Sequence, residues 1–300
     1  MTVVLLSGGS GGAKLARGLY EVLGDDLHVI ANTADDVELY GAHISPDPDL
    51  IAYWLADMID QRGFGIAGDS FNVMAGLREL GAETWFELGD RDLAACIERR
   101  RLLEAGISLT EALAHLTAAH GVRAHVLAMC ETPVRTHIRS DGRWVGLQEF
   151  LIQGRGAWPI EEVEFRGAAE AEPAPAALEA IAAARSIVIG PSNPVISIDP
   201  ILSIPGMRDA LANARAPVVA VSPIVGGEVL KGPTEAFLQW AGRSCDAGGV
   251  AAHYAGLIDG LVADEPATGL PALQTTTLMD DPPARRALAE QTLAFCETLR

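Results

Sequence analysis

The chain has 300 residues, almost half of them apolar, which is enough to bury the core of an α/β domain. Its net charge of −18 and its two lysines exclude a general affinity for nucleic acids, which requires a basic surface. No uncharged apolar run approaches the roughly 20 residues of a membrane span. Residues 1–6 lack the basic start and long apolar stretch of a signal peptide. We therefore expect a cytoplasmic protein without membrane partners.

The first elements in chain order predict a βαβ unit. Val3–Leu6 is an apolar strand that ends in a glycine-rich segment, a helix follows from about Ala13 to Leu23, and Leu27–Ala31 forms the next strand. Similar apolar strands return late in the chain. The sequence therefore predicts an α/β fold, a Rossmann-like parallel sheet with helices on both faces. The late strands are Ser186–Gly190, Pro217–Ser222 and Leu257–Ala263.

The middle of the chain differs from both ends. Residues 50–120 carry apolar residues at i, i+3 and i+4 spacing and predict a mainly helical insert. Beyond it, four short segments predict a small antiparallel addition, with a tight turn at Ser140–Gly142 between two of them. We expect one domain over 1–300, with a core of 1–49 and 121–300. The four segments are Ala124–Met129, Val134–Arg139, Phe150–Gln153 and Glu161–Phe165.

The glycine-rich segment between the first strand and the first helix is a candidate nucleotide site. Its backbone amides can approach a phosphate closely, and the helix start favours negative charge. It is neither a Walker P-loop nor a G-x-G-x-x-G fingerprint. A tight turn without a ligand is the structural alternative, and Lys14 is either a phosphate ligand or a solvated helix lysine. The predicted nucleotide-binding residues here are Gly8, Gly9, Ser10, Gly11, Gly12 and Lys14.

Four aspartates follow the second strand. Asp35 and Asp36 come directly after it, and Asp47 and Asp49 lie shortly beyond. Because the carboxyl ends of parallel strands line the ligand crevice, these carboxylates are predicted to hold Mg²⁺ together with substrate phosphates. Asp49 also precedes the apolar run that begins at Leu50, where it could instead cap a helix.

Three further segments are weaker signals when each is taken alone. Residues 88–92, L-G-D-R-D, open a predicted helix that Asp90 or Asp92 could cap. Loops after two late strands place Ser192, Asn193 and Ser222 where they could hydrogen-bond a nucleotide. With Gly8, these loops would lie along one rim of the sheet.

These segments together resemble the CofD family, the 2-phospholactate or phosphoenolpyruvate transferases of deazaflavin coenzyme F-420 biosynthesis. The resemblance covers nearly the whole chain. The chain differs from the usual residues of this family at Phe64, Cys130–Thr132 and Asp199. These differences bear on which acid is transferred. The segments that carry the resemblance are Asn32–Asp36, Ile44–Asp49, Leu88–Asp92, Gly190–Pro194 and Val221–Gly227.

The resemblance implies a reaction. A guanosine diphosphate ester of a three-carbon acid gives its phospho-acid portion to the ribityl hydroxyl of the deazaflavin, 7,8-didemethyl-8-hydroxy-5-deazariboflavin, and GMP is released. It also implies Mg²⁺ and a homodimer. The glycine segment and the later loops would hold the guanosine diphosphate part. Asp49, Glu87, Asp90 and Arg91 would bind the deazaflavin.

Asp47 and Asp49 are the predicted catalytic residues. They would hold Mg²⁺, with Asp35 or Asp36, or Asp49 would orient the attacking hydroxyl and accept its proton. One alternative is a regulatory protein of the YvcK type that binds nucleotide sugars. The other is a dinucleotide-dependent oxidoreductase, which the broken glycine fingerprint and Asn32 at the end of the second strand disfavour.

Overall fold

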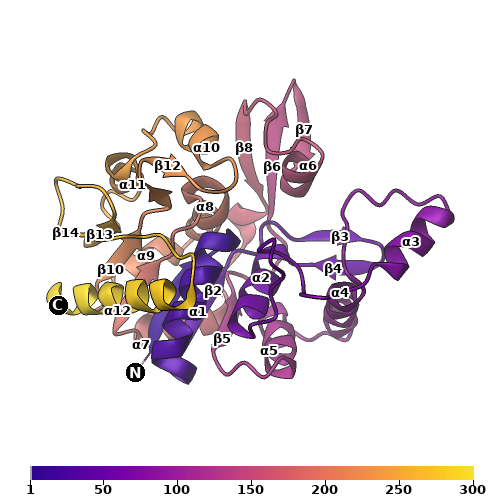
Figure 1. The fold of residues 1–300 in the computed structure, drawn as a ribbon, viewed down its shortest axis with the longest axis horizontal. Helices are drawn as coiled ribbons and strands as arrows, with labels where there is room; N and C mark the ends of the chain where they lie inside the picture. Colours follow the sequence, from indigo (N-terminus) through magenta and orange to yellow (C-terminus); the bar gives the residue numbers. More distant parts are fainter. Residues whose placement is uncertain (1) are drawn as a thin grey trace.

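A computed structural model describes residues 2–300, which are built around a seven-stranded sheet in the order β14-β13-β10-β9-β1-β2-β5 (Figure 1). Every neighbouring pair is parallel. The predicted α/β class is confirmed, and the loops after β1, β9 and β10 leave the same edge. The strands are β1 (Val3–Ser7), β2 (Leu27–Ala31), β5 (His125–Ala128), β9 (Ser186–Ile189), β10 (Val218–Val221), β13 (Gly260–Ala263) and β14 (Ala272–Gln274).

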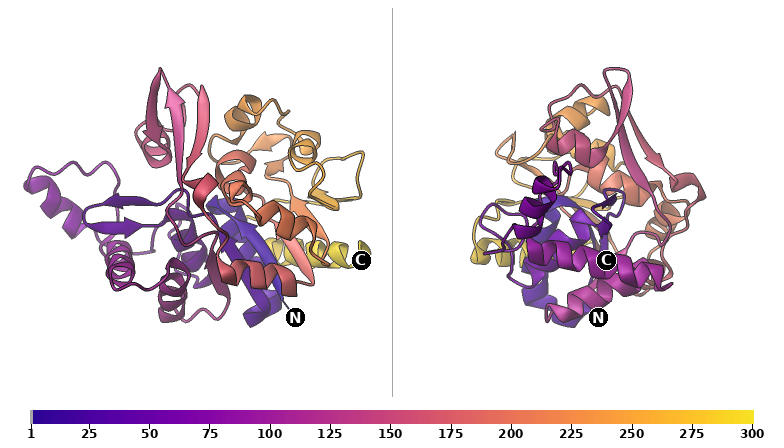
Figure 2. Two further views of the ribbon diagram at one scale, coloured as in Figure 1. Left: turned by 180° about the vertical axis from the view of Figure 1, so that it is seen from behind. Right: turned by 90° about the vertical axis from the view of Figure 1, so that its right-hand side faces the viewer.

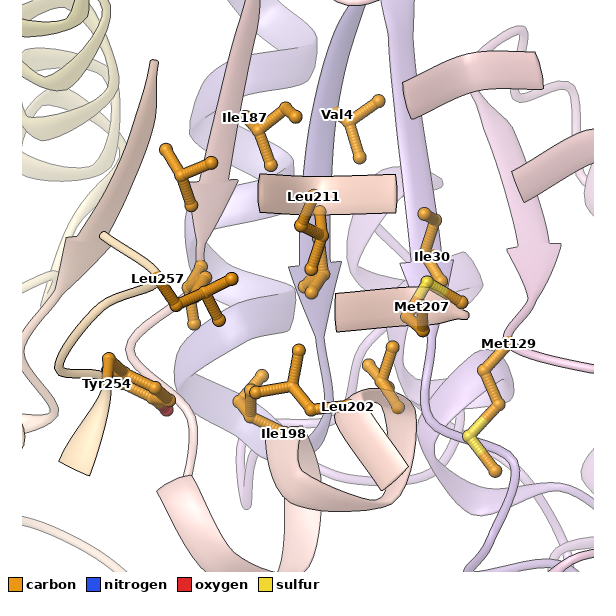
Figure 3. Packing of buried hydrophobic residues seen from close by; sticks show 14 of the residues in the cluster. Val4, Ile30, Met129, Ile187, Ile198, Leu202, Met207, Leu211, Tyr254 and Leu257 are labelled. Atoms are coloured by element: carbon orange, nitrogen blue, oxygen red, sulfur yellow. The ribbon is translucent and has the colours of Figure 1, made fainter. Parts of the chain in front are cut away.

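Helices cover both faces of this sheet, so its central strands β1, β9 and β10 are buried along their whole length and are mostly apolar. Val3 and Leu5 of β1 pack into one core, and Val4 and Leu6 into the other, which Figure 3 shows around Leu202. The first core lies under α1 (Gly9–Leu23), α2 (Pro46–Leu55), α5 (Leu109–Ala119) and α12 (Pro282–Thr298). The second lies under α7 (Pro175–Ala183), α8 (Asp199–Ser203), α9 (Met207–Ala212) and α11 (Ala247–His253).

Two smaller units project from the sheet (Figures 1 and 2). The first is an arm that packs around Met74, Phe86 and Leu93; it contains the hairpin β3 (Val37–Leu39) and β4 (Ala42–Ile44) with α3 (Asn72–Glu79) and α4 (Asp90–Glu104). The second is the antiparallel sheet β7-β6-β8, made of β6 (Arg135–Ser140), β7 (Arg143–Gly146) and β8 (Glu162–Arg166). The remaining elements are α6 (Leu147–Ile152), α10 (Thr234–Trp240), β11 (Ile224–Val225), β12 (Glu228–Val229), the 3₁₀ turns η1 (Gly24–Asp26) and η2 (Ala168–Glu170), and the π-helical turn η3 (Pro194–Ile198).

The antiparallel addition is smaller than predicted. The segment Ala124–Met129 does not belong to it, because β5 pairs with β2 in parallel and extends the main sheet. Phe150–Gln153 is not a strand; residues up to Ile152 lie in α6, since a four-residue apolar run does not separate strand from helix. The predicted turn is confirmed: Asp141 and Gly142 have φ of 48° and 74°, as a tight hairpin requires.

Two helix starts also differ from the prediction. α1 begins at Gly9 rather than Ala13, so the glycine segment is the first turn of the helix instead of a loop before it. α2 begins at Pro46, so Asp49 lies in its first turn and is not its cap. Within residues 2–300, no helix has the length and apolarity that crossing a bilayer requires.

Candidate functional site

The glycine helix start packs directly on the loop that follows β9. A methyl group at Gly11 would lie 2.0 Å from the carbonyl oxygen of Pro191, and one at Gly12 would lie 2.3 Å from Ser7 Oγ. The Gly8 amide donates to Ser192 Oγ at 3.3 Å. Glycine is therefore needed here for close packing, in addition to any role in holding a phosphate.

Because of this packing, alanine is expected to change the free energy of unfolding in opposite directions at two helical glycines, Gly11 and Gly76. Gly11→Ala is expected to lower the free energy of unfolding by about 1–3 kcal/mol, because the backbone of Pro191 cannot give way easily. Gly76→Ala on α3 is expected to raise it by about 0.5–1 kcal/mol, since a methyl group there meets nothing within 4 Å. Urea unfolding of both variants measures the difference, and equal effects would contradict the close contact.

A pair of aspartates lies beside the helix start. Asp47 Oδ1 accepts a hydrogen bond from the Gly9 amide at 2.6 Å. The Asn32 side chain donates to Asp47 Oδ2 and to Asp35 Oδ1, both at 2.9 Å, and also to the Ile196 carbonyl at 3.3 Å. We call Asn32, Asp35 and Asp47 the carboxylate centre. It joins the end of β2, the start of α2, the start of α1 and the turn η3.

Neither Asp35 nor Asp47 forms an ion pair within residues 2–300. Burial raises the pKa of Asp47 to about 6. Burial, followed by the neighbouring charge of Asp47, raises the pKa of Asp35 well above its ordinary value. Two desolvated carboxylates that share one amide donor bind either a proton or a cation. The pair fits Mg²⁺, which binds through one or two carboxylates and completes its shell with water and substrate phosphates.

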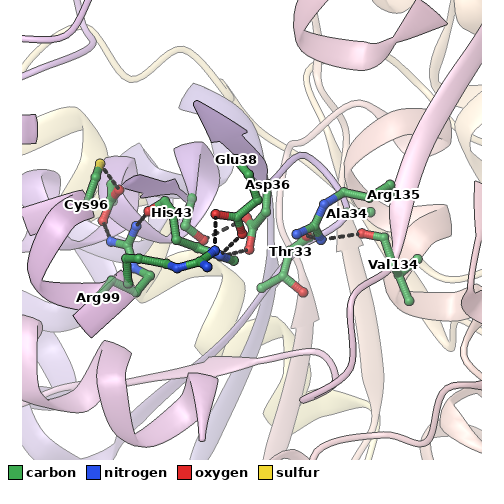
Figure 4. A network of polar contacts seen from close by, with 12 residues as sticks. Thr33, Ala34, Asp36, Glu38, His43, Cys96, Arg99, Val134 and Arg135 are labelled. Carbon is green, nitrogen blue, oxygen red and sulfur yellow. Dashed lines mark hydrogen bonds and ion pairs between the residues drawn. The ribbon is translucent and has the colours of Figure 1, made fainter. Parts of the chain in front are cut away.

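Asp36 and Asp49, the other two predicted metal ligands, each contact a basic side chain. Asp36 accepts from Ser45 Oγ at 2.7 Å and contacts His43 Nε2 at 2.9 Å. Asp49 forms an ion pair with the fully buried Arg99. Arg99 also donates to the His43 carbonyl at 2.8 Å, and both of these residues are seen in Figure 4.

The four aspartates consequently do not surround one point. In residues 2–300, the group that brings three potential ligand atoms within 4.8 Å of one another is Asp49, Asp92 and Cys96. Arg99 already neutralises Asp49 in that group. Asp35 and Asp47 are the two that remain available to a metal.

Three of the four residues that the resemblance assigned to the deazaflavin lie on the arm, whereas Asp49 lies on α2. Glu87 is exposed and forms an ion pair with Arg78 at 3.1 Å, and the exposed Arg91 lies in the first turn of α4. Asp90 accepts from the amides of Asn72 and Val73, at 3.1 and 3.0 Å, and so caps α3. Hydrogen bonds from Ser70 and from α3 lower the pKa of Asp90 to about 2. The arrangement gives Asp90 a capping function.

Besides Ser192, the late loops contribute two polar side chains, Asn193 and Ser222. Asn193 Oδ1 caps η3 by accepting from the amides of Val195 and Ile196, at 3.0 and 3.3 Å, while its buried Nδ2 has no partner among the described residues. That donor is free for a ligand. The buried Ser222 Oγ accepts from the Ile224 amide at 3.2 Å and so shapes its own loop.

The remaining two predicted phosphate ligands lie on α1. Ser10 is partly exposed in its first turn, and Lys14 lies over the ring of Trp54, 6.0 Å from its centroid. The aromatic contact favours neither the phosphate role nor the solvated role of Lys14.

A cavity of about 270 Å³ opens beside the carboxylate centre. Asp35, Asp36, Trp85 and Arg135 lie in its wall, and the Arg135 guanidinium donates to the Val134 carbonyl at 2.8 Å (Figure 4). Arg135 and the buried Arg99 supply local positive charge in an acidic chain. Sequence reasoning missed both, because each is distant along the chain from the aspartates and lies in no glycine or aspartate motif.

A Rossmann-like sheet with buried carboxylates and a glycine helix start at its carboxyl edge defines an α/β protein suited to phosphorylated ligands. The model of the family described as 2-phospho-L-lactate transferase CofD matches residues 3–284, and the chain belongs to this CofD family of transferases. The predicted resemblance is confirmed.

Relatives of two kinds match almost the whole chain. The chain is 40% identical to a 2-phospho-L-lactate transferase of Methanosarcina mazei, over 88% of this chain and 87% of the relative. It is 38% identical to a phosphoenolpyruvate transferase of Kitasatospora aureofaciens, over 100% and 99%. A crystal structure of a UPF0052 family protein from Bacillus halodurans shares the fold, with a TM-score of 0.62 at 15% identity and coverage of 97% and 98%.

Proposed function

We propose that the chain transfers a phosphorylated three-carbon acid from its guanosine diphosphate ester to the ribityl hydroxyl of 7,8-didemethyl-8-hydroxy-5-deazariboflavin, in deazaflavin coenzyme F-420 biosynthesis. The hydroxyl oxygen forms a bond to the phosphorus that carries the acid, and the bond from that phosphorus to the bridging oxygen breaks. GMP leaves with the bridging oxygen, and the hydroxyl proton passes to a base or to water.

The observation that carries the proposal is the contact between Asp47 and the amide of Gly9. It brings a carboxylate suited to Mg²⁺ next to a helix start suited to phosphate, so a metal-bound diphosphate would contact both the metal and the start of α1. Asp35 and Asp47 would hold Mg²⁺, which when bound neutralises charge on the diphosphate. The Asn193 Nδ2 donor, also at this edge, would bind a diphosphate oxygen.

Asp49 is the proposed base and deazaflavin ligand. Its ion pair with Arg99 fixes its orientation and holds a carboxylate in a buried position. A fixed carboxylate can orient a hydroxyl and accept its proton. Glu87, Asp90 and Arg91 would contribute to acceptor binding through the arm rather than through the carboxylate centre.

The experiment supplies the purified chain with the deazaflavin, Mg²⁺ and the guanylylated ester of lactate, enolpyruvate or glycerate. We expect a product whose mass is the deazaflavin plus one phospho-acid, together with one equivalent of GMP. The relatives named for phospholactate and for phosphoenolpyruvate are similarly close, so the product mass identifies the acid. Omission of Mg²⁺ is the control and is expected to stop product formation.

A regulatory protein that binds nucleotide sugars, the alternative function, would retain guanosine diphosphate and yield no deazaflavin product with any of the three esters. Identities of 38–40% to transferases over nearly the full chain favour the enzyme.

We also propose that the protein is a homodimer. Light scattering of the protein as it elutes from a size-exclusion column measures its mass and tests this.

A further inference from the structure

A second polar cavity shares no residue with the carboxylate centre. Its volume is about 290 Å³, and its walls come from β8, α8, α9, α11 and the segment after α10. Phe165, Leu202 and Ala241 form its apolar part. The polar part contains Asp199, Arg208, Arg243 and His253.

The charges in this cavity are unbalanced. His253 Nε2 lies 3.0 Å from both oxygens of Asp199, so the imidazole is the hydrogen-bond partner of that carboxylate. The guanidinium of Arg208 reaches Asp199 only at 4.0 Å. Arg243 has no acidic partner among residues 2–300. The cavity wall therefore contains two guanidinium groups and one carboxylate, in a chain whose net charge is −18.

The polar side chains around Asp199 are largely buried. His253 and Asp199 are largely buried, with exposed side-chain fractions of 9% and 22%. The neighbouring Tyr254 hydroxyl is buried and has no hydrogen-bond partner among the described residues. The Tyr254 ring packs edge-on against the His253 ring, with 5.1 Å between the centroids. Burial raises the pKa of Tyr254 well above its ordinary value, and the charges of Asp199 and Arg208 add smaller opposing effects.

We propose that this cavity binds a small oxyanion, a phosphate or a carboxylate. The Arg208 and Arg243 guanidinium groups bind the anion, because planar donor forks match the geometry of both groups. Asp199 fixes the imidazole of His253 at the edge of the site. α8, which begins at Asp199, directly follows the turn η3 that contacts Asn32, so the site adjoins the segment that leads to the carboxylate centre.

The test follows the imidazole resonances of the full chain, labelled with ¹⁵N-histidine, during titration with inorganic phosphate and, separately, acetate. The chain has seven histidines, and His253→Gln assigns the relevant signal. We expect the His253 resonances to move and saturate with at least one of the two anions. Arg243→Gln and Arg208→Gln are each expected to weaken that response at least tenfold.

Matched variants separate this site from others. Arg215→Gln, at an exposed arginine outside the cavity, is expected to leave the response unchanged. Asp47→Asn is expected to leave it unchanged as well, so the outcome does not depend on the proposed transferase site. Unmoved His253 resonances in the original chain, or equal responses in Arg243→Gln and Arg215→Gln, would overturn the proposal. Should Arg208→Gln misfold, the exposed Arg243 still decides the result.

Discussion

Asp47→Asn is expected to reduce transferase turnover by at least about 100-fold, because the variant loses a charged ligand for an ion that contributes several kcal/mol to charge neutralisation. Asparagine can still accept the hydrogen bond from the Gly9 amide, so the helix start keeps its partner. Turnover at saturating Mg²⁺ measures the effect. Asp141→Asn, at an exposed turn position with φ of 48° that asparagine also adopts, is the matched control and is expected to retain full activity.

Asp47→Asn is also expected to stabilise the protein above pH 6. The pKa of Asp47 is raised to about 6 in the folded state, so ionisation of this buried carboxyl costs stability as the pH rises from about 4 to 6. Asparagine removes that cost, which amounts to about 3 kcal/mol or less at pH 8, and the loss of the Oδ2 acceptor for the Asn32 side chain offsets part of the gain. The advantage disappears below about pH 4, where the carboxyl is protonated in both states. Urea unfolding without Mg²⁺ at pH 8 and pH 4 checks it; a variant less stable at pH 8 would contradict the assignment of Asp47 as an uncompensated charge.

Arg99→Met is expected to lower the free energy of unfolding by about 3–5 kcal/mol at pH 8, because it leaves Asp49 charged, buried and unpaired. Burial lowers the pKa of Arg99, but the charges of Asp49 and its neighbours outweigh it and raise that pKa, so the arginine stays charged at every working pH. Loss of the arginine raises the pKa of Asp49, so the deficit is expected to shrink as the pH falls and the carboxyl is protonated.

A double variant separates the pair from the packing around it. Asp49→Leu with Arg99→Met removes both charges, and we expect it to be more stable than Arg99→Met alone. Arg101→Met changes an exposed arginine on the same helix, whose partner is Glu98, and is expected to leave the urea midpoint unchanged. A deficit below about 1 kcal/mol in Arg99→Met would mean that Asp49 is already neutral in the folded protein.

The order of strands and helices could be predicted from the sequence, because it depends on local patterns. Continuous apolar runs such as Val3–Leu6 belong to strands buried on both faces, and alternating helices require parallel pairing. Asp141 and Gly142 specified their turn through backbone conformation alone. The glycine segment and the aspartates were recognisable because strand ends of a parallel sheet share one edge.

Tertiary structure alone decided how these residues are paired. Asp35, Asp36, Asp47 and Asp49 are equivalent as sequence letters, yet Asn32 joins two of them, His43 holds the third and Arg99 the fourth. Those partners come from other elements, and no local propensity encodes a contact between α2 and α4. The start of α1 at Gly9 was likewise hidden, because glycine disfavours helix, and it is the close contact of Gly11 with Pro191 that requires glycine in this first turn. Long-range burial sets which carboxylate is charged, and that is a property of the folded chain.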